Sequence, residues 1–133
     1  MLTILIANQK GGVGKTTIAD ELAFELERRG ASVSFISTDP QGGSVHETDD
    51  GDKERDWRIV DTPGVLADAL PEWCEAADMV LVPMLPSSRD IEPTLRTIEV
   101  ARKSTSAPVA VVVNQYNPYG VLDRQLAEYL AGE

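Results

Sequence analysis

The sequence predicts an α/β fold: a minimal parallel β-sheet of about five strands with helices on both faces. Short apolar segments alternate along the chain with longer segments whose apolar residues recur every three or four positions. Most of the apolar segments also lead into a loop that carries glycine, proline, aspartate or asparagine. Loops that follow parallel strands gather at one edge of a sheet, so we expect the functional residues there, around one ligand.

Length and composition indicate one globular domain. The chain has 133 residues, of which 42% are hydrophobic, enough for one core. No apolar run approaches the ~20 residues that span a bilayer, and the N-terminus lacks the basic region of a signal peptide. With a single cysteine, Cys74, an internal disulfide is excluded, and we expect a cytoplasmic protein. The formal net charge of -10 opposes adhesion to nucleic acid or anionic lipid through net charge alone.

The first predicted unit is a strand, a glycine loop and a helix. Residues 2–7 are apolar on both faces, as in a buried parallel strand. Over residues 18–29 the apolar side chains fall on one face, and Gly30 ends the helix. The opposite, solvent face is predicted to carry the charged residues, which are Asp20, Glu21, Glu25, Glu27, Arg28 and Arg29.

The later elements continue the alternation. Strands are predicted over residues 31–37, 57–60, 79–82 and 108–113, and helices over residues 65–77 and 121–131. A further helix is predicted to be capped by Asp90, with Pro93 in its first turn and an inner face of Ile91, Leu95, Ile98 and Ala101. Residues 43–56 are polar and acidic, and their spacing fits no calcium loop. We therefore predict a solvated connector there, with no metal site at His46.

Residues 9–17 (QKGGVGKTT) carry the core of a P-loop between the first strand and the first helix. Backbone N–H groups and the helix N-terminus would bind phosphate oxygens. Lys15 would reach the β and γ phosphates, the Thr16 hydroxyl would ligate Mg²⁺, and Thr17 would donate to the α phosphate. The predicted nucleotide-binding residues of this loop are Gly11, Gly12, Val13, Gly14, Lys15, Thr16 and Thr17. A glycine-rich turn without a ligand is the weaker alternative in this context.

The loop departs from the standard pattern and resembles the deviant P-loop of the ParA/MinD family of dimeric ATPases. Gln9 stands where the standard pattern has glycine, and Lys10 follows it. The resemblance implies ATP or ADP and Mg²⁺ as cofactors, and a Lys10 that reaches the phosphates of the partner's ATP. A cation supplied in trans would stabilise charge on the transferring phosphoryl group. On spacing alone, Lys10 could equally be a solvent-exposed loop residue.

Two further segments are similar to the family's switches. In residues 38–42 (TDPQG) the resemblance implies that Asp39 orients the attacking water, contributes to the metal site and, with Lys10 and Lys15, makes up the catalytic set. Ser37 stands where the family has its first switch aspartate. In residues 61–64 (DTPG) Asp61 would hold Mg²⁺ through water, beside Thr16. The implied switch residues are Pro40, Gln41, Thr62, Pro63 and Gly64.

The resemblance extends to about residue 114. Residues 83–90 (PMLPSSRD) resemble a segment more specific to the ParA branch than to MinD, and Asn114 stands where the family places an adenine-contacting asparagine. It implies a single ParA-like ATPase domain over residues 1–133. The acidic loop at 43–56 stands where a longer element is expected, and the family's C-terminal strand and helices are absent.

The function implied by the resemblance is a Mg²⁺-dependent ATP-binding and hydrolysing dimerisation switch. It would act in partition or positioning of plasmid or chromosomal DNA or another large cargo, as a homodimer with a ParB-like or cargo adaptor. The alternative is a nucleotide-binding regulatory module that hydrolyses little and modulates a full-length relative. A ligase of the same superfamily would need a second substrate pocket, and an iron–sulfur reductase would need more cysteines than Cys74.

Contacts with membrane and DNA are not favoured by the charge pattern. Residues 121–133 hold one basic residue, Arg124, against three acids, which opposes membrane anchoring. Arg96, Arg102 and Lys103 could touch DNA phosphates, although a solvated helix face explains them better.

Overall fold

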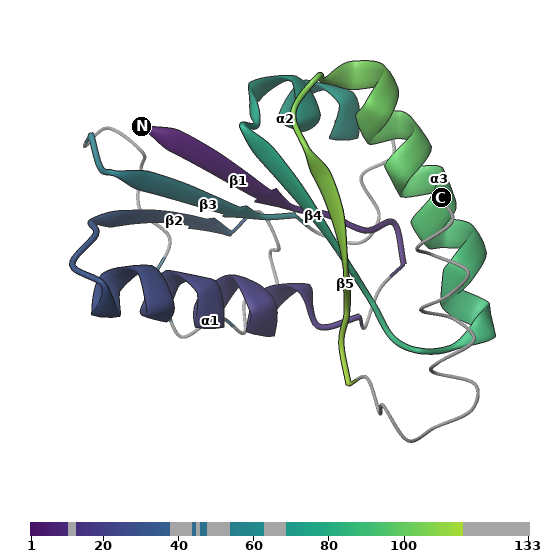
Figure 1. The fold of residues 1–133 in the computed structure, drawn as a ribbon, viewed down its shortest axis with the longest axis horizontal. Helices are drawn as coiled ribbons and strands as arrows, with labels where there is room; N and C mark the ends of the chain where they lie inside the picture. Colours follow the sequence, from purple (N-terminus) through teal and green to yellow (C-terminus); the bar gives the residue numbers. More distant parts are fainter. Residues whose placement is uncertain (11–12, 38–43, 45, 48–53, 63–68, 116–133) are drawn as a thin grey trace.

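A computed structural model describes residues 1–10, 13–37, 44, 46–47, 54–62 and 69–115 of the chain (Figure 1). Strands and helices alternate through these residues, as the sequence predicts. In chain order the elements are β1 (Leu2–Ile6), α1 (Lys15–Arg28), β2 (Val33–Ser37), β3 (Trp57–Asp61), α2 (Leu70–Ala76), β4 (Met79–Met84), α3 (Ser88–Ser104) and β5 (Val109–Val113). The helix predicted over residues 121–131 lies outside the described residues.

The strands form one five-stranded sheet in the order β2-β3-β1-β4-β5, and every pair of neighbours is parallel. This confirms the predicted fold class. β1 is the central strand, with β3 on one side and β4 on the other. After β3 the chain therefore crosses to the other side of β1, where β4 pairs. The loop after β1 lies where the strand order reverses, which is the usual ligand position in such sheets.

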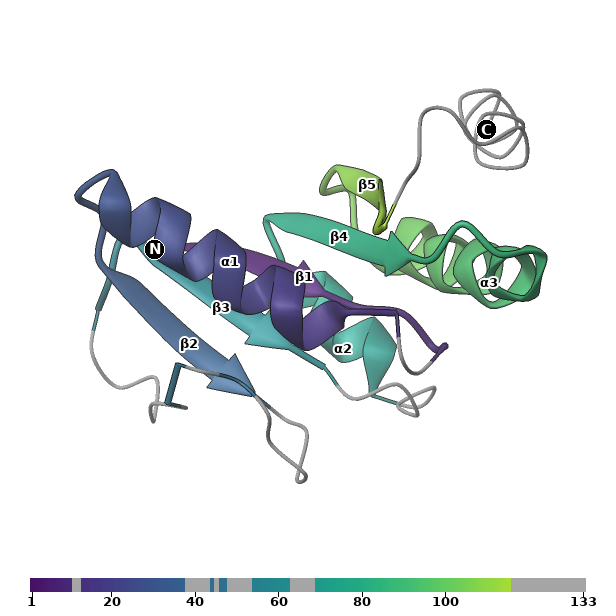
Figure 2. The ribbon, with the colours of Figure 1, turned by 90° about the horizontal axis from the view of Figure 1, so that it is seen from below.

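Side chains alternate along β1 between two apolar layers, one on each face of the sheet. Ile4 and Ile6 pack with Ala19 and Ala23 of α1. Leu5 instead packs with residues from the other side of the sheet, among them Cys74 of α2 and Ile98 and Ala101 of α3. Figures 1 and 2 show α1 on one face, with α2 and α3 on the other. Burying one such aliphatic side chain stabilises the fold by about 1.5–3 kcal/mol. The apolar residues of β1 therefore stabilise the packing on both faces of the sheet.

The start of α3 differs from the prediction. Ser87, not Asp90, caps the helix, since its extended backbone brings Oγ to 3.3 Å from the N–H of Arg89. Asp90 is 2% exposed and accepts the N–H of Leu85 at 2.8 Å, which holds the turn before the helix. Pro93 lies inside the helix, beyond its first turn.

The inner face of α3 is also more polar than predicted. Ile98 and Ala101 are buried there, as expected, but so are Asp90, Thr94 and Thr97, and Ile91 and Leu95 are only partly buried. On α2, described from Leu70, Pro71 lies in the first turn, where a missing N–H costs nothing.

The predicted solvent position of Asp20 is wrong. Asp20 is 7% exposed, because its carboxylate accepts the backbone N–H of His46 at 3.0 Å and lies 2.8 Å from His46 Nδ1. His46 Nε2 contacts the Glu27 carboxylate, and the ring stacks at 5.2 Å on Phe35 of β2. His46 is therefore hydrogen-bonded to two residues of α1, and the prediction of a solvated connector is wrong at this residue.

Among the described residues, no helix combines the length and the apolar character that crossing a bilayer requires.

Candidate functional site

The residues of the predicted site follow the carboxyl ends of the strands. Asn8 to Lys10 follow β1, Asp61 ends β3 with Thr62 directly after it, and Asn114 follows β5. Backbone hydrogen bonds tie these ends together: Thr62 donates to Ile6 O at 3.2 Å, and Asn114 donates to Met84 O at 2.7 Å. The structure thus gathers at one edge residues that lie more than a hundred positions apart in the sequence.

The turn into α1 depends on Gly14. Its φ of 87° is in the left-handed region, which glycine adopts without strain. A Cβ atom there would lie 2.3 Å from Nδ2 of Asn114. That amide donates to Val13 O at 3.4 Å, so Asn114 lies directly against the glycine loop. Its predicted contact with adenine stays a prediction.

Lys15 begins α1 and is 8% exposed. Its ammonium group donates to the backbone carbonyl oxygen of Lys10 at 3.2 Å, across the loop. The Lys15 side chain therefore reaches back across the loop, and this acceptor is a neutral carbonyl. A phosphate oxygen offers a stronger, charged acceptor, which makes this lysine suited to anion binding.

Thr16 and Asp61, both predicted to belong to a metal site, are hydrogen-bonded to each other. The Thr16 hydroxyl donates to Asp61 Oδ2 at 2.7 Å, and Asp61 is 1% exposed at the end of β3. A hydroxyl and a buried carboxylate are hard oxygen donors, the kind that Mg²⁺ prefers. The residues present fit a magnesium ion. Thr17, the predicted α-phosphate donor, is solvent-exposed in the first turn of α1.

Thr62 follows Asp61 and is tied to the central strand. Its hydroxyl donates to Ile6 O at 2.9 Å, and it is 3% exposed. Seven other predicted site residues lie outside the described part of the chain, and their roles stay predictions: Gly11, Gly12, Asp39, Pro40, Gln41, Pro63 and Gly64. Ser37 is described, at the end of β2, in register with Asp61.

A buried polar cluster behind the loop was missed by the sequence reasoning. Asn8 is 2% exposed, and its amide nitrogen donates to Pro83 O at 2.8 Å and to the Thr94 hydroxyl at 3.0 Å. Its amide oxygen accepts the N–H of Lys10 at 2.9 Å, while the Thr97 hydroxyl accepts the N–H of Gln9 at 3.0 Å. The signal available in the sequence was the pair Thr94 and Thr97, which lie three positions apart among the apolar residues predicted for the inner face of this helix.

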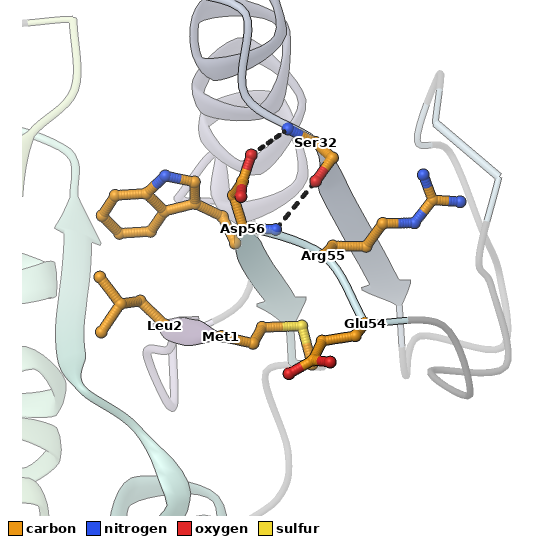
Figure 3. A pocket seen from close by; sticks show the side chains of 7 residues that line it. Met1, Leu2, Ser32, Glu54, Arg55 and Asp56 are labelled. Atoms are coloured by element: carbon orange, nitrogen blue, oxygen red, sulfur yellow. Dashed lines mark hydrogen bonds between the residues drawn. The ribbon is translucent and has the colours of Figure 1, made fainter.

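A pocket of about 540 Å³ lies at the opposite, amino edge of the sheet (Figure 3). It is lined by Met1, Leu2, Ser32, Glu54, Arg55, Asp56 and Trp57. Ser32 and Asp56 exchange two hydrogen bonds of 2.9 Å, each from a backbone N–H to the other side chain. Of the predicted nucleotide-site residues that the structure describes, none lines this pocket.

A lysine and a threonine at a strand-to-helix turn, with a carboxylate of the neighbouring strand against that threonine, define a nucleotide-binding P-loop domain. The family model described as "CobQ/CobB/MinD/ParA nucleotide binding domain" matches residues 4–133. The chain belongs to this family, as the resemblance in its P-loop indicates.

Several relatives act in positioning or partition, by their names. The chain is 32% identical, over 93% of its length and 71% of the relative's, to the maintenance of carboxysome distribution protein A of Halothiobacillus neapolitanus. It is 56% identical over 42 residues, 17% of that protein, to the chromosome-partitioning ATPase Soj of Thermus thermophilus. The alignment with the carboxysome protein spans 156 residues, more than this chain contains, so it includes gaps on this chain's side.

Solved structures share the fold. Apo McdA of Cyanthece superposes with a TM-score of 0.80 at 20% identity, covering 99% of this chain and 81% of that one. A plasmid partition protein of Borrelia burgdorferi gives 0.82 at 18% identity, covering 99% and 86%. Cobyrinic acid a,c-diamide synthase of Mycobacterium smegmatis, solved with an ATP analogue and magnesium, gives 0.77 at 20% identity, covering 100% and 82%. These three proteins, with their different printed names, share the fold of this chain.

Proposed function

We propose that this chain is a Mg²⁺-dependent ATPase switch of the ParA type, which dimerises with ATP and separates after hydrolysis. The observation that carries the proposal is the hydrogen bond between Thr16, which follows the P-loop lysine, and Asp61. The Thr16 hydroxyl lies 2.7 Å from the carboxylate of Asp61, which is buried. This hydrogen bond joins the phosphate loop to the oxygen ligands of a metal site. The relatives named for partition and carboxysome distribution support a role in positioning a large cargo through an adaptor.

Each site residue has a distinct task in this proposal, including Asp39, which lies outside the described part of the chain. Lys15 exchanges its bond with the Lys10 carbonyl for the β and γ phosphates. Thr16, and Asp61 through water, would hold the magnesium ion, which supplies charge neutralisation at the phosphates when bound. Asp39 orients the attacking water. Lys10 crosses to the phosphates bound by the partner protomer and stabilises the charge that develops during transfer.

Binding of DNA by the face of α3 gains little support. Arg96 lies 3.9 Å from Glu92, and Lys103 lies 2.8 Å from Glu99, so two of the three predicted cations face a carboxylate of their own helix. Both pairs are exposed, and the chain carries a net charge of -10. A protein or protein-coated cargo is therefore the better partner for this chain than bare DNA.

The test separates hydrolysis from dimerisation. We expect Lys15→Ala to lower ATP turnover by about 100-fold or more, since it removes a phosphate-stabilising charge. We expect Lys10→Ala to bind ATP but to remain monomeric with a slowly hydrolysed ATP analogue, measured by size-exclusion chromatography with light scattering. Lys103→Ala is the matched control, because that lysine is exposed on α3 and pairs only with Glu99 among the contacts described. Turnover that survives Lys15→Ala rules out the ATPase, and full dimerisation of Lys10→Ala rules out the lysine in trans.

A regulatory module with little hydrolysis is the second candidate, and Ser37 favours it. This residue ends β2 in register with Asp61, where a hydroxyl replaces the carboxylate of the family's first switch. A parent chain that dimerises with ATP but turns over no faster than Lys15→Ala would establish this candidate over the switch.

A further inference from the structure

The segment that carries Lys10 is anchored by the Asn8 side chain, the backbone carbonyl of Pro83 on β4 and two threonine side chains of α3. None of these groups has a place in the nucleotide chemistry. Both backbone polar groups of Lys10 are hydrogen-bonded: its N–H donates to Asn8 Oδ1 at 2.9 Å, and its carbonyl accepts from Lys15 Nζ at 3.2 Å. The second bond is the one that a nucleotide would replace. The first is independent of the nucleotide.

The orientation of the Asn8 amide follows from its neighbours. Pro83 O is an acceptor only, so the amide atom at 2.8 Å from it must be the nitrogen. The second amide proton goes to the Thr94 hydroxyl at 3.0 Å. The oxygen then faces the N–H of Lys10. Two donors and one acceptor are used in a side chain that is 2% exposed, a combination that Asp, Ser or Thr could not supply.

Thr97 fixes the preceding peptide. Its hydroxyl has a single proton, which goes to Pro93 O at 2.9 Å, one turn back in α3. The oxygen is then left to accept the N–H of Gln9 at 3.0 Å, while Asn8 Oδ1 at 3.5 Å is only a contact. Thr94 and Thr97 are both 0% exposed. Two successive backbone N–H groups of the loop entry are therefore held by a fully buried polar cluster.

We propose that Asn8 is the positioning residue for Lys10, and that Thr94 and Thr97 of α3 hold the segment that carries it. The inference rests on the proposed role of Lys10 in trans. A long lysine side chain that must cross an interface loses less freedom on binding when its backbone is already fixed. The cluster should therefore strengthen the ATP dimer while leaving nucleotide binding by one protomer almost unchanged.

The variants are chosen on α3, because substitution of Asn8 itself could prevent folding. Thr97→Val keeps the shape of the side chain but leaves the N–H of Gln9 without its acceptor, and Thr97→Ser restores that acceptor. Ser104→Ala is the matched control: the Ser104 hydroxyl makes the same bond to the carbonyl one turn back, at 2.7 Å to Val100 O, and lies in the last turn of α3. It therefore removes an equivalent helix bond without altering the loop.

The readouts are nucleotide affinity of the monomer, dimer dissociation with a slowly hydrolysed ATP analogue, and hydrogen exchange of the Gln9 and Lys10 amides by NMR. For Thr97→Val we expect a dimer about tenfold weaker, the loss for one buried hydrogen bond, and faster exchange at Gln9. Monomer affinity should stay within about threefold, which corresponds to less than half of that bond. Thr97→Ser should restore the dimer, and Ser104→Ala should resemble the parent chain.

The possible outcomes separate this inference from the proposed function. If Lys10→Ala dimerises fully, the role in trans fails and the positioning role fails with it. If Lys10→Ala is monomeric while Thr97→Val dimerises like the parent chain, only the positioning inference is overturned. It is also overturned if Thr97→Val weakens nucleotide binding and dimerisation equally, since that result indicates a structural role. A selective loss of the dimer that Thr97→Ser reverses supports it.

Discussion

Raising the pH should lower the unfolding free energy of this protein, because it deprotonates His46, the single histidine of the chain. Desolvation of the ring lowers its pKa, but hydrogen bonds with Asp20 and Glu27 oppose this, and the net result is a pKa raised above the ordinary value of 6.5. Protonated His46 is thus favoured by folding. Its stabilisation is complete below the unfolded pKa and is lost as the pH rises through the folded pKa.

The magnitude follows from the two carboxylates that the ring joins. A hydrogen bond to a charged group contributes about 1.5–3 kcal/mol when buried. The Asp20 side chain is 9% exposed, so its bond keeps most of that value, whereas Glu27 is 47% exposed, and its bond is worth about 0–1 kcal/mol. A neutral ring keeps one donor, on either nitrogen. Deprotonation should therefore cost about 1–2 kcal/mol of unfolding free energy.

The assay is urea denaturation at about pH 6 and about pH 9, on either side of histidine titration. The parent chain should lose this stability at the higher pH, and His46→Gln, which cannot titrate, should lose much less. Proton NMR of the ring should show a pKa above 6.5 that falls in Glu27→Gln. Glu21→Gln, at an exposed carboxylate of the same helix, is the matched control and should leave it unchanged. A ring pKa below 6.5, or equal pH dependence in the parent and His46→Gln, would refute the reasoning.

Three further predictions concern other parts of the molecule. Gly14→Ala should lower the unfolding free energy by about 1–2 kcal/mol, because alanine is strained in the left-handed backbone conformation. It should also weaken nucleotide binding, since the added Cβ would displace Asn114, and unchanged affinity in a nucleotide titration would contradict this. Asp61→Asn should abolish the stimulation of nucleotide affinity by Mg²⁺ while leaving metal-free binding in place, measured by calorimetry with and without EDTA; retained stimulation would remove Asp61 from the metal site. Burial raises the pKa of the Cys74 thiol, which is 0% exposed, so Ellman's reagent should react with it only after denaturation, and rapid reaction of the native chain would contradict the packing of α2.

The sheet could be predicted because its signal is local. The buried positions Ile4, Leu5 and Ile6 of β1, and Ala7 directly after it, are all apolar, and their division between two layers follows from strand alternation. Strand ends are less well predicted. β4 runs to Met84 through Pro83, which pairs with Val112 of β5 although proline lacks an N–H donor. Proline reads as the end of a strand from sequence, and only the neighbouring strand shows that this one continues.

The candidate site divides in the same way. Lys15, Thr16 and Asp61 could be named in advance, since their residue types and places after strands are tied to phosphate and metal chemistry. Asn8 and Thr94 could not, because their hydrogen bond joins residues 86 positions apart and either side chain alone is unremarkable in type. His46 was misassigned for a related reason: acidic neighbours in sequence suggested solvent, whereas its partners are on α1, 26 and 19 positions away.

The parallel sheet also provides a labelling position that lies away from the glycine loop. Met1 and Leu2 are 44% and 48% exposed at the amino edge, while the glycine loop follows the other end of the same strand. Five residues of strand rise about 3.3 Å each, so a dye or affinity tag on the first residue would stand on the order of 16 Å from the loop. A fluorophore attached there can report association of two chains by energy transfer while leaving the loop and its lysines unaltered.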